Sequence, residues 1–387
     1  MADVVIVGAG PVGLYLAALL LQEGVRVRVL EQRLHRDRHS RAIGIHPPSL
    51  TALDRVGVAS ALVNEGVAIR RGFAISRGKT VGSLSFAAVS DEFPFVLALP
   101  QFRTEEILEG RVRELDCTAL VRGARVTGLE DDGARVTVEV GGGGAGPGIG
   151  DDHDVPGRHS AALVVAADGS RSQVRNLLGI PARNKTYPDH YVMGDFAAAG
   201  RFGHDAVLFL EAGGIVESFP LPGGLRRWVV RVSEPMAAPT ANGLAALVQR
   251  RTGIRPETAT NSMLSSFSVR SSIARTLLAG RTALIGDAAH EISPIGGQGM
   301  NLGWLDAEEL APIVCAALEG KPVGRRLRDF DVRRRRAANV ARWQSEVNMM
   351  LGRPLPRRIL GLRNGAIGAV AAIPPVNRLV ARRFTMQ

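Results

Sequence analysis

The feature that most restricts the fold is a glycine-rich turn near the N-terminus. Gly8, Gly10 and Gly13 follow a short β-branched run at 4–7 and open a helical stretch. Such a run is typical of a buried parallel strand. A second strand is expected at 25–30, and the acidic residue Glu31 ends it, about 20 residues after the turn. This order of strand, glycine turn, helix, strand and acid predicts a βαβ unit that binds a dinucleotide.

The chemistry of the turn follows from its residue types. Glycines permit a tight turn and let a pyrophosphate approach the backbone, while a helix N-terminus supplies free N–H groups and partial positive charge. The acid at the end of the second strand would accept hydrogen bonds from an adenosine ribose. The turn alone does not distinguish FAD from NAD. We expect cofactor contacts from Gly8, Gly10, Pro11, Val12, Gly13, Glu31 and Gln32.

Other features narrow the functional class. Residues 4–21 carry no charge, but Asp3 precedes them and glycines interrupt them, which disfavours a signal peptide or a membrane span. Cys117 and Cys315 form no CxxC pair, so a reducing, cytoplasmic setting is expected. The spacing of His, Cys, Asp and Glu predicts no metal site, and no Ser-His-Asp arrangement stands out.

Two further motifs follow buried strands later in the chain. Residues 286–290 are Gly-Asp-Ala-Ala-His, and residues 294–303 are Pro-Ile-Gly-Gly-Gln-Gly-Met-Asn-Leu-Gly. Residues 167–175 are Ala-Asp-Gly-Ser-Arg-Ser-Gln-Val-Arg. The first closely resembles the GD motif, and the second the DG motif, of flavoprotein hydroxylases of the para-hydroxybenzoate hydroxylase type. Leu-Pro-Gln-Phe-Arg at 99–103 and Ser-Arg-Ala at 40–42 match further motifs of that family.

The resemblance covers most of the chain, about residues 1–375. It implies a class A, FAD-dependent aromatic hydroxylase, in the short form without a thioredoxin-like C-terminal domain. FAD is then the cofactor and NAD(P)H a transient electron donor. The matching positions imply cofactor contacts at Arg41, Gln101, Asp168, Gly286, Asp287, Pro294, Gly297, Gly299, Met300 and Asn301. For Asp168 an alternative stays open, because its carboxylate also suits capping of the helical turn at 170–178.

The residue types of the GD motif suit a flavin. Asp287 would accept a hydrogen bond from a ribityl hydroxyl. The glycine run at 296–299 begins a helix, whose N-terminus would stabilise the negative charge of a reduced flavin by about 0.3–2 kcal/mol. Pro294 has no N–H and a fixed φ, which suits a wall beside the ring. We therefore assign Pro294 and Gly296 to the catalytic centre.

Two histidines near these motifs are interpreted differently. His46 follows Arg41 closely and is included in the catalytic centre, as a group that would face the flavin or the substrate. His290 follows two alanines on an element expected to be buried, so we interpret it as a structural histidine.

The resemblance implies a monooxygenase that uses FAD, NAD(P)H and O₂. It would hydroxylate an aromatic small molecule, phenolic or polyketide-like, through a C4a-hydroperoxyflavin. The flavin carries this chemistry, while the protein binds, excludes water and stabilises charge. Two alternatives stay open. One is a flavin-dependent epoxidase or reductase that acts on a quinone or isoprenoid near a membrane, and the other is an FAD-binding protein without catalytic activity.

The expected fold is α/β, with a Rossmann-like three-layer FAD-binding domain, an inserted, mostly antiparallel substrate sheet and C-terminal helices. Short strands are expected at 191–197, 206–211, 215–220 and 227–232, and a helix at 49–61. We assign 1–75, 100–180 and 276–325 to the FAD-binding domain, 76–99 and 181–275 to the substrate domain, and 326–387 to a basic helical segment.

The net charge of +11 is concentrated near the C-terminus. Residues 320–387 carry sixteen basic and three acidic side chains, whereas the rest of the chain is nearly neutral. The segment is explained either by solvated helices that pack an apolar face on the body, or by peripheral contact with an anionic membrane or an acidic carrier. Nucleic acid is not an expected partner, since only 5% of residues are aromatic. The oligomeric state is left open.

Overall fold

The lobe that contains the N-terminus is built on a six-stranded sheet. The computed structural model describes residues 2–36, 42–142 and 157–386. Neighbouring strands from β19 to β8 pair in parallel, so their carboxyl ends meet at one edge of the sheet. In spatial order the strands are β18 (Leu278–Ala279), β19 (Thr282–Leu284), β12 (Leu163–Ala166), β1 (Val4–Val7), β2 (Val27–Glu31) and β8 (Leu120–Arg122).

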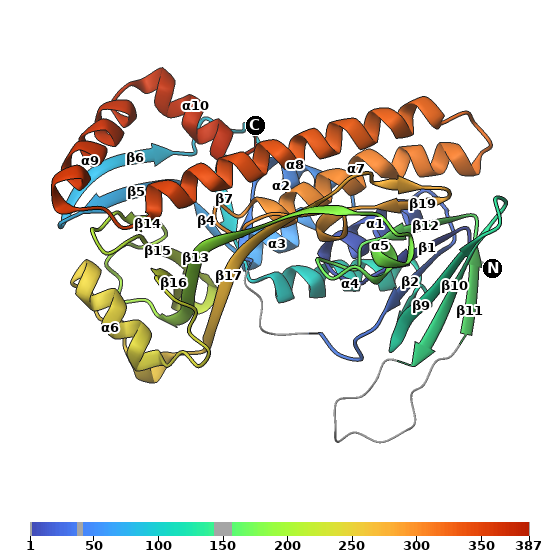
Figure 1. The fold of residues 1–387 in the computed structure, drawn as a ribbon, viewed down its shortest axis with the longest axis horizontal. Helices are drawn as coiled ribbons and strands as arrows, with labels where there is room; N and C mark the ends of the chain where they lie inside the picture. Colours follow the sequence, from blue (N-terminus) through green and yellow to red (C-terminus); the bar gives the residue numbers. More distant parts are fainter. Residues whose placement is uncertain (1, 37–41, 143–156, 387) are drawn as a thin grey trace.

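Helices and a second sheet complete the three layers of this lobe (Figure 1). Helix α1 (Pro11–Gln22) packs on β1 and β2 and contacts both α4 (Gln101–Leu115) and α7 (Gln298–Leu318). The third layer contacts β1 and β2 and is the antiparallel sheet of β9 (Ala124–Asp131), β10 (Val136–Gly142) and β11 (Gly157–Ala161). Strands β9 and β10 follow each other in the chain and form an antiparallel hairpin, with Val136 opposite Asp131.

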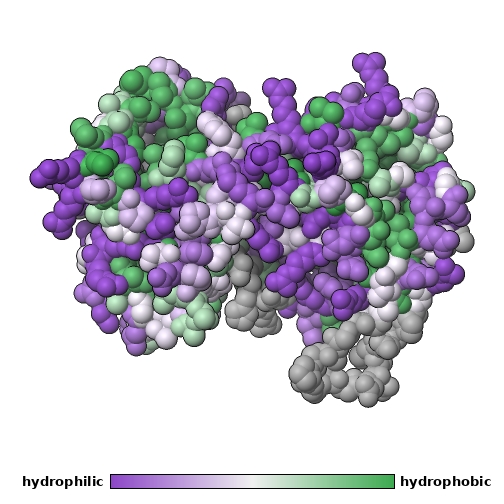
Figure 2. Space-filling model, in the orientation of Figure 1, coloured by the Kyte–Doolittle hydropathy of each residue, from purple (hydrophilic) through white to green (hydrophobic). Residues whose placement is uncertain are grey.

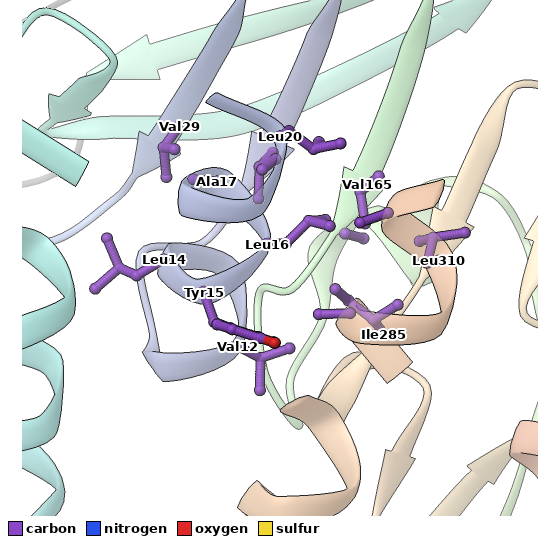
Figure 3. Packing of buried hydrophobic residues seen from close by; sticks show 14 of the residues in the cluster. Val12, Leu14, Tyr15, Leu16, Ala17, Leu20, Val29, Val165, Ile285 and Leu310 are labelled. Carbon is purple, nitrogen blue, oxygen red and sulfur yellow. The ribbon is translucent and has the colours of Figure 1, made fainter. Parts of the chain in front are cut away.

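The core of this lobe is centred on α1. Both β1 and most of α1 are buried, which explains why they are apolar on all sides. Figure 3 shows Leu16 pointing toward Val165, whereas Leu14 points to the opposite side of the helix. The Tyr15 hydroxyl donates to the carbonyl oxygen of Ala52 at 2.6 Å, which satisfies the one polar atom of that buried ring. The charge-free N-terminal stretch is therefore part of the core.

The second lobe is an eight-stranded sheet. Of its pairs, β14 and β5 are parallel and the others are antiparallel. Strands β13 and β17 are long and run from one lobe to the other (Figure 1). In spatial order the strands are β20 (His290–Glu291), β17 (Met263–Ala274), β13 (Ala182–Ala197), β16 (Leu225–Val232), β15 (Val216–Leu221), β14 (Ala206–Phe209), β5 (Arg71–Ser76) and β6 (Lys79–Ser85).

Smaller elements fill the space around the sheets. Helix α6 (Ala241–Thr252) packs on β13, β15 and β16. A three-stranded sheet joins β3 (Gly44–Ile45), β7 (Val96–Ala98) and β4 (Val67–Ile69). Helix α5 (Gln173–Leu177) contacts β9. Single turns of 3₁₀-helix occupy Pro222–Gly224, Thr258–Thr260 and Gly286–Ala288.

Two predicted elements differ from the structure. The single helix predicted at 49–61 is wrong, because α2 (Pro47–Asp54) and α3 (Ala59–Glu65) are separated by a turn in which Gly57 has a φ of +75°. A positive φ ends a right-handed helix. The strand predicted to begin at 191 begins at 182, and β13 continues across an irregularity in its pairing with β17.

The predicted fold class is confirmed, since a parallel sheet with helices, a large mostly antiparallel sheet and C-terminal helices are all present. The domain boundaries stay predictions. Strand β5 spans the boundary placed after residue 75 and pairs with β14 and β6 in the eight-stranded sheet.

Three helices form the C-terminal segment. Helix α8 (Gly324–Gly352) packs along α7, whereas α9 (Arg357–Ala371) and α10 (Pro374–Phe384) pack on β6 (Figure 1). Among the described helices, no single one is long and apolar enough to cross a membrane. The pair α9 and α10 meets that criterion together, with a bend of 100° between the two helices.

Part of the basic charge of α8 is neutralised within the fold. Arg334 is buried and its Nε lies 2.5 Å from Oδ1 of Asp306 on α7. Arg333 of α8 also pairs with an acid of α7, Glu309, at 2.6 Å. Arg335 pairs with Asp331 within α8, also at 2.6 Å. The arginines of α8 therefore include structural ones that hold α8 against α7.

Candidate active site

Four predicted residues form a row at the carboxyl edge of the parallel sheet. Gly8 follows β1, Glu31 ends β2, Asp168 follows β12, and Asp287 follows β19. These four strands are neighbours in the order β19, β12, β1, β2. At about 4.8 Å per strand, the row spans about 14 Å. Ligands of open α/β sheets bind outside the carboxyl ends of the strands, so the row marks a ligand groove.

The glycines of the N-terminal turn have different structural reasons. A Cβ on Gly8, whose φ is +103°, would lie 2.4 Å from the Ala167 carbonyl oxygen, and one on Gly13 would lie 2.0 Å from the Gly8 carbonyl oxygen. These two glycines permit close packing of the turn, β12 and α1. A Cβ on Gly10 would meet nothing within 4 Å. The open space at Gly10 therefore lies where a ligand would approach the N-terminus of α1.

Glu31 is fixed by backbone groups on either side of it. Its Oε2 accepts from the N–H of Ala9, and its Oε1 accepts from the N–H of Arg33, both at 2.9 Å. Each carboxylate oxygen keeps a further lone pair. The side chain is thereby held at the cavity wall, where it can accept from a ligand hydroxyl.

Asp168 caps a helix with one carboxylate oxygen and leaves the other without a partner in the described part of the chain. Its Oδ2 accepts from the N–H of Val174 at 3.1 Å, which caps the first turn of α5. Its Oδ1 is buried and has no hydrogen-bond partner among the described residues, although the residue lines the cavity. Burial raises the pKa of Asp168. The capping role is thus observed, and the free oxygen is available to a ligand.

The GD motif is held by a buried charge cluster. Oδ2 of Asp306 accepts from His290 Nε2 at 2.6 Å and from the N–H of Gly286 at 2.9 Å, while Oδ1 accepts from Arg334. Burial alone would lower the pKa of His290, but the Asp306 carboxylate outweighs it and raises that pKa. His290 is fully buried in this cluster, in agreement with its interpretation as a structural histidine.

The DG motif also braces the GD motif. Arg175 is buried, and its NH1 donates to the carbonyl oxygen of Ala288 at 2.9 Å. Its NH2 donates to the carbonyl oxygen of Ser170 at 3.2 Å. Segments more than a hundred residues apart in the sequence are therefore held in register at the cavity.

Asp287 has a surface that opens into the cavity. The residue lines the cavity, and its side chain is exposed there. Burial, followed by the charge of Glu291, raises the pKa of Asp287 to about 6. A ligand that covered the carboxyl group would keep solvent away from it and favour the full rise in its pKa. The group is suited to accept a hydrogen bond from a ligand hydroxyl.

The loop before α7 brings backbone groups to the cavity. Gly296 and Gly297 have φ values of +99° and +67°, and Gly297 is the N-cap of α7. The Gly297 N–H donates to the carbonyl oxygen of Pro294 at 3.0 Å. The first turn of α7 has no acidic residue, so its N-terminal partial charge faces the cavity without a competing carboxylate on the helix.

Asn301 holds this loop from behind. Its Nδ2 donates to the carbonyl oxygens of Gly44 and Gly297 at 3.0 and 2.6 Å, and its Oδ1 accepts from the N–H of His46 at 2.8 Å. The side chain is fully buried. Asn301 therefore shapes the cavity through three hydrogen bonds within the protein.

His46 lies on the cavity wall at the start of α2. Its ring stacks on Phe384 of α10, with ring centroids 5.8 Å apart. Burial lowers the pKa of His46 to about 4, so the ring is neutral at pH 7 and is a weak base. Its Nδ1 has no partner among the described residues. These properties fit a hydrogen-bonding group better than a general base.

One cavity of about 1820 Å³ connects these residues. Typical small-molecule pockets occupy about 300–1,000 Å³, so this one has room for a dinucleotide and a further ligand. Of the predicted site residues that the structure describes, Gly13 and Asn301 lie outside the lining, and Arg41 falls outside the described residues. The others line it: Gly8, Gly10, Pro11, Val12, Glu31, Gln32, His46, Gln101, Asp168, Gly286, Asp287, Pro294, Gly296, Gly297, Gly299 and Met300.

The far part of the cavity includes residues that the sequence did not identify. Apolar side chains of β14, β15 and β16 form its floor, and α8, α9 and α10 form a wall, with contributions from Asn348, Ile367 and Phe384. The segment 326–387, assigned as a separate basic region, thus encloses the cavity. Glu217 on β15 was also missed, although an acid within the apolar run 215–221 was a visible signal.

The residues present fit FAD. Gly10 leaves open space at a helix N-terminus, as a pyrophosphate requires. Asp168 keeps an unpartnered buried oxygen at the cavity. Glu31 and Asp287 add acceptors at both ends of the row. Among the described residues, no group of three or more His, Cys, Asp or Glu side chains could hold a metal ion.

Comparison with known proteins agrees with this geometry. A family model described as an FAD binding domain matches residues 1–344. The chain is 33% identical to the 12-dehydrotetracycline 5-monooxygenase/anhydrotetracycline 6-monooxygenase of Streptomyces rimosus, over 98% of this chain and 75% of that protein. This match covers nearly all of the present chain.

Solved structures show the same architecture. The structure of a p-nitrophenol 4-monooxygenase from Pseudomonas putida aligns with a TM-score of 0.87 and 26% identity, over 99% of this chain and 97% of that one. The anhydrotetracycline hydroxylase from Streptomyces rimosus aligns with a TM-score of 0.80 and 31% identity, over 100% of this chain and 76% of that one.

Proposed function

The chain belongs to the FAD-binding-domain family of FAD-dependent monooxygenases, and we propose that it hydroxylates a phenolic or polyketide-like aromatic compound with NAD(P)H and O₂. The observation that carries this proposal is that one cavity runs from the glycine turn past the GD motif to its far part. We call this far part, between β14, β15 and β16 on one side and α8, α9 and α10 on the other, the apolar chamber. The relatives named as anhydrotetracycline and p-nitrophenol monooxygenases support this substrate class.

The residues of the row would hold the cofactor. When bound, FAD would supply the redox chemistry that takes two electrons from NAD(P)H and activates O₂, with one oxygen atom passing to the substrate and the other to water. Glu31 would accept from a ribose, and the N-terminus of α1 would face the pyrophosphate. Asp168 and Asp287 would accept from hydroxyl groups of the cofactor through their free oxygens.

The loop before α7 would form the reactive end of the site. Pro294 and Gly296 would lie beside the ring system, and the N-terminus of α7 would stabilise negative charge on it. His46, neutral at pH 7, would donate or accept a hydrogen bond there. The C-terminal helices would exclude water from the chamber, which strengthens each of these interactions.

The visible spectrum of the purified protein is the first test, because bound FAD absorbs where protein does not. The second is mass spectrometry of phenols and polyketide-like polycycles incubated with the protein, NADH or NADPH, and ¹⁸O₂. We expect a product that carries one ¹⁸O atom. A colourless protein that cannot be reconstituted with FAD would contradict the proposal, as would products without ¹⁸O from every candidate.

A second candidate function follows from the outer surface of α9 and α10. Four apolar side chains there are exposed and lie outside the cavity lining: Ile359, Leu362, Ile373 and Leu379. Figure 2 shows apolar residues gathered over this region at the upper left. Residues 357–384 carry six arginines and no acid. This combination favours contact with an anionic membrane, and with it an epoxidase or reductase that acts on a quinone or isoprenoid.

Two measurements separate the candidates. Co-sedimentation with anionic vesicles, compared between the wild type, Leu362→Glu on α9 and the control Val332→Glu on α8, tests the membrane contact. Both side chains are exposed, at 77% and 58%, so a loss confined to Leu362→Glu supports it. Oxidation of NAD(P)H under anaerobic conditions with a quinone favours a reductase, whereas strict dependence on O₂ favours the hydroxylase. A cytoplasmic location is part of the hydroxylase proposal.

A further inference from the structure

Glu217 faces the apolar chamber from the middle of the eight-stranded sheet. In the β15 register it lies opposite Leu208 of β14 and Val229 of β16. Ile215 and Phe219, two residues away on either side, point to the same face because side chains alternate along a strand. All five residues line the cavity. A carboxyl group is thus placed among four apolar neighbours.

No hydrogen bond or ion pair to the Glu217 carboxyl group is found among the residues that the structure describes. The side chain is 8% exposed. Burial raises the pKa of Glu217 to about 7, and no other group contributes to this shift. An unpaired buried acid costs free energy, so it needs a reason outside the folding of the sheet.

The charged groups on the surrounding elements are engaged elsewhere. On β16, Arg227 donates to both oxygens of Asp195 at 2.7 and 2.8 Å. Arg231 of β16 and Arg353 after α8 both bind Asp189 of β13, at 3.0 and 2.7 Å. From α9 and α10, the cavity wall receives apolar side chains and Asn377. These three arginines therefore form their ion pairs with Asp195 and Asp189.

Tyr191 of β13 is a further titratable group near Glu217. Burial, followed by the charge of Glu217, raises the pKa of Tyr191, so its hydroxyl stays protonated. The ring stacks on Phe267 with centroids 5.5 Å apart, and Tyr191 does not line the cavity. Glu217 is thus the group through which this part of the sheet offers a hydrogen-bond acceptor to the chamber.

We propose that Glu217 is the substrate-recognition residue of the chamber, whose carboxylate accepts a hydrogen bond from a hydroxyl group on the aromatic substrate. This inference rests on the proposed aromatic hydroxylation and narrows its substrate class. A neutral, multi-ring phenol satisfies both the apolar neighbours and the acceptor. A substrate with a carboxylate at this position would place two like charges together and is disfavoured.

The test uses the FAD-loaded protein and two matched ligands. 1-Naphthol carries a hydroxyl donor, whereas 1-methoxynaphthalene has the same rings and only an acceptor. Binding is read from the change that each ligand causes in the flavin absorbance, without turnover. The proteins are the wild type, Glu217→Gln, Glu217→Leu and the control Glu130→Gln, which alters an exposed acid on the β9–β10 hairpin.

We expect the wild type and Glu130→Gln to bind 1-naphthol about tenfold more tightly than its methyl ether, since a hydrogen bond to a charged group is of this size. Glu217→Leu should bind the two alike. Raising the pH from 6 to 8 ionises Glu217, so it should tighten 1-naphthol binding and weaken ether binding in the wild type. Glu217→Gln, which cannot titrate, should show neither change.

The variants also separate recognition from a structural role. Loss of an unpaired buried acid should leave Glu217→Leu at least as resistant to urea as the wild type, whereas a structural acid would leave the variant less stable. The same preference for 1-naphthol in all four proteins would overturn the proposal, as would failure of the wild type to bind either ligand at millimolar concentration. Hydroxylation with ¹⁸O₂ is measured in parallel, so loss of the Glu217 effect alone leaves the proposed function intact.

Discussion

Substitution of Gly10 by alanine should weaken cofactor binding alone, whereas substitution of Gly13 by alanine should destabilise the fold. A Cβ on Gly13 would lie 2.0 Å from the Gly8 carbonyl oxygen and 3.3 Å from Cβ of Ala167. Neither neighbour can rotate away, because one is a backbone oxygen and the other is a Cβ atom bonded directly to the backbone. Overpacking costs about 1–3 kcal/mol, and a contact this short belongs at the upper end. Alanine returns up to about 1 kcal/mol through its helix propensity, so a net loss of about 2 kcal/mol is expected.

Gly10 has neither constraint. Its φ of −74° and ψ of 177° are allowed for alanine, and a Cβ there would meet nothing within 4 Å. The weaker N-cap and the smaller unfolded-state entropy of alanine nearly cancel, which leaves stability within about 0.5 kcal/mol of the wild type. The added methyl group would occupy the space of the pyrophosphate, so FAD binding should weaken by about tenfold to a hundredfold.

The assay is a pair of titrations on each protein. Urea unfolding of the FAD-free form gives the free energy of unfolding, and quenching of FAD fluorescence gives the dissociation constant. Gly10→Ala should change the second quantity alone, whereas Gly13→Ala should lower the first. Wild-type FAD affinity in Gly10→Ala, or wild-type stability in Gly13→Ala, would refute the division of roles between the two glycines.

Three further substitutions test the support of the site. Asp306→Asn leaves Arg334 and His290 buried without their counter-charge, so urea unfolding should show a loss of about 3–5 kcal/mol, against almost none in the control Glu309→Gln. Because folding raises the pKa of His290, its pair with Asp306 stabilises the fold fully below pH 6.5, the ordinary pKa of a histidine. The free energy of unfolding should fall as the pH rises through the raised pKa, and His290→Gln should show a flatter dependence of this free energy on pH. Asn301→Ala breaks three hydrogen bonds and should cost about 1–3 kcal/mol in the same assay.

The sequence was informative where function depends on local backbone geometry. The glycine turn and the acid ending β2 follow from one short βαβ segment, and the structure places them at one cavity. Asp168 and Asp287 were identified by resemblance. Their position in the same row follows from the parallel pairing of β12 with β1 and β19, which local patterns do not encode. Their contacts with FAD stay predictions.

The sequence was least informative where side chains meet through tertiary packing. The role of Asn301 depends on a loop more than 250 residues away, which no spacing reveals. The sequence allows the C-terminal helices to pack an apolar face on the body or to contact a membrane, but no local pattern reveals that their apolar side chains line the cavity. The sequence pattern places Gly57 within a helix, because a positive φ cannot be inferred from a single glycine in an otherwise helical pattern.

The central claim is that the carboxyl edge of the parallel sheet binds FAD. FAD content of purified Asp287→Ala, relative to the wild type, tests it most directly, because Asp287 lines the cavity at one end of the row and makes no hydrogen bond that the fold requires among the described residues. We expect a folded protein, with unchanged urea unfolding of the FAD-free form, that is isolated with little or no FAD. An Asp287→Ala protein with wild-type FAD content would contradict it.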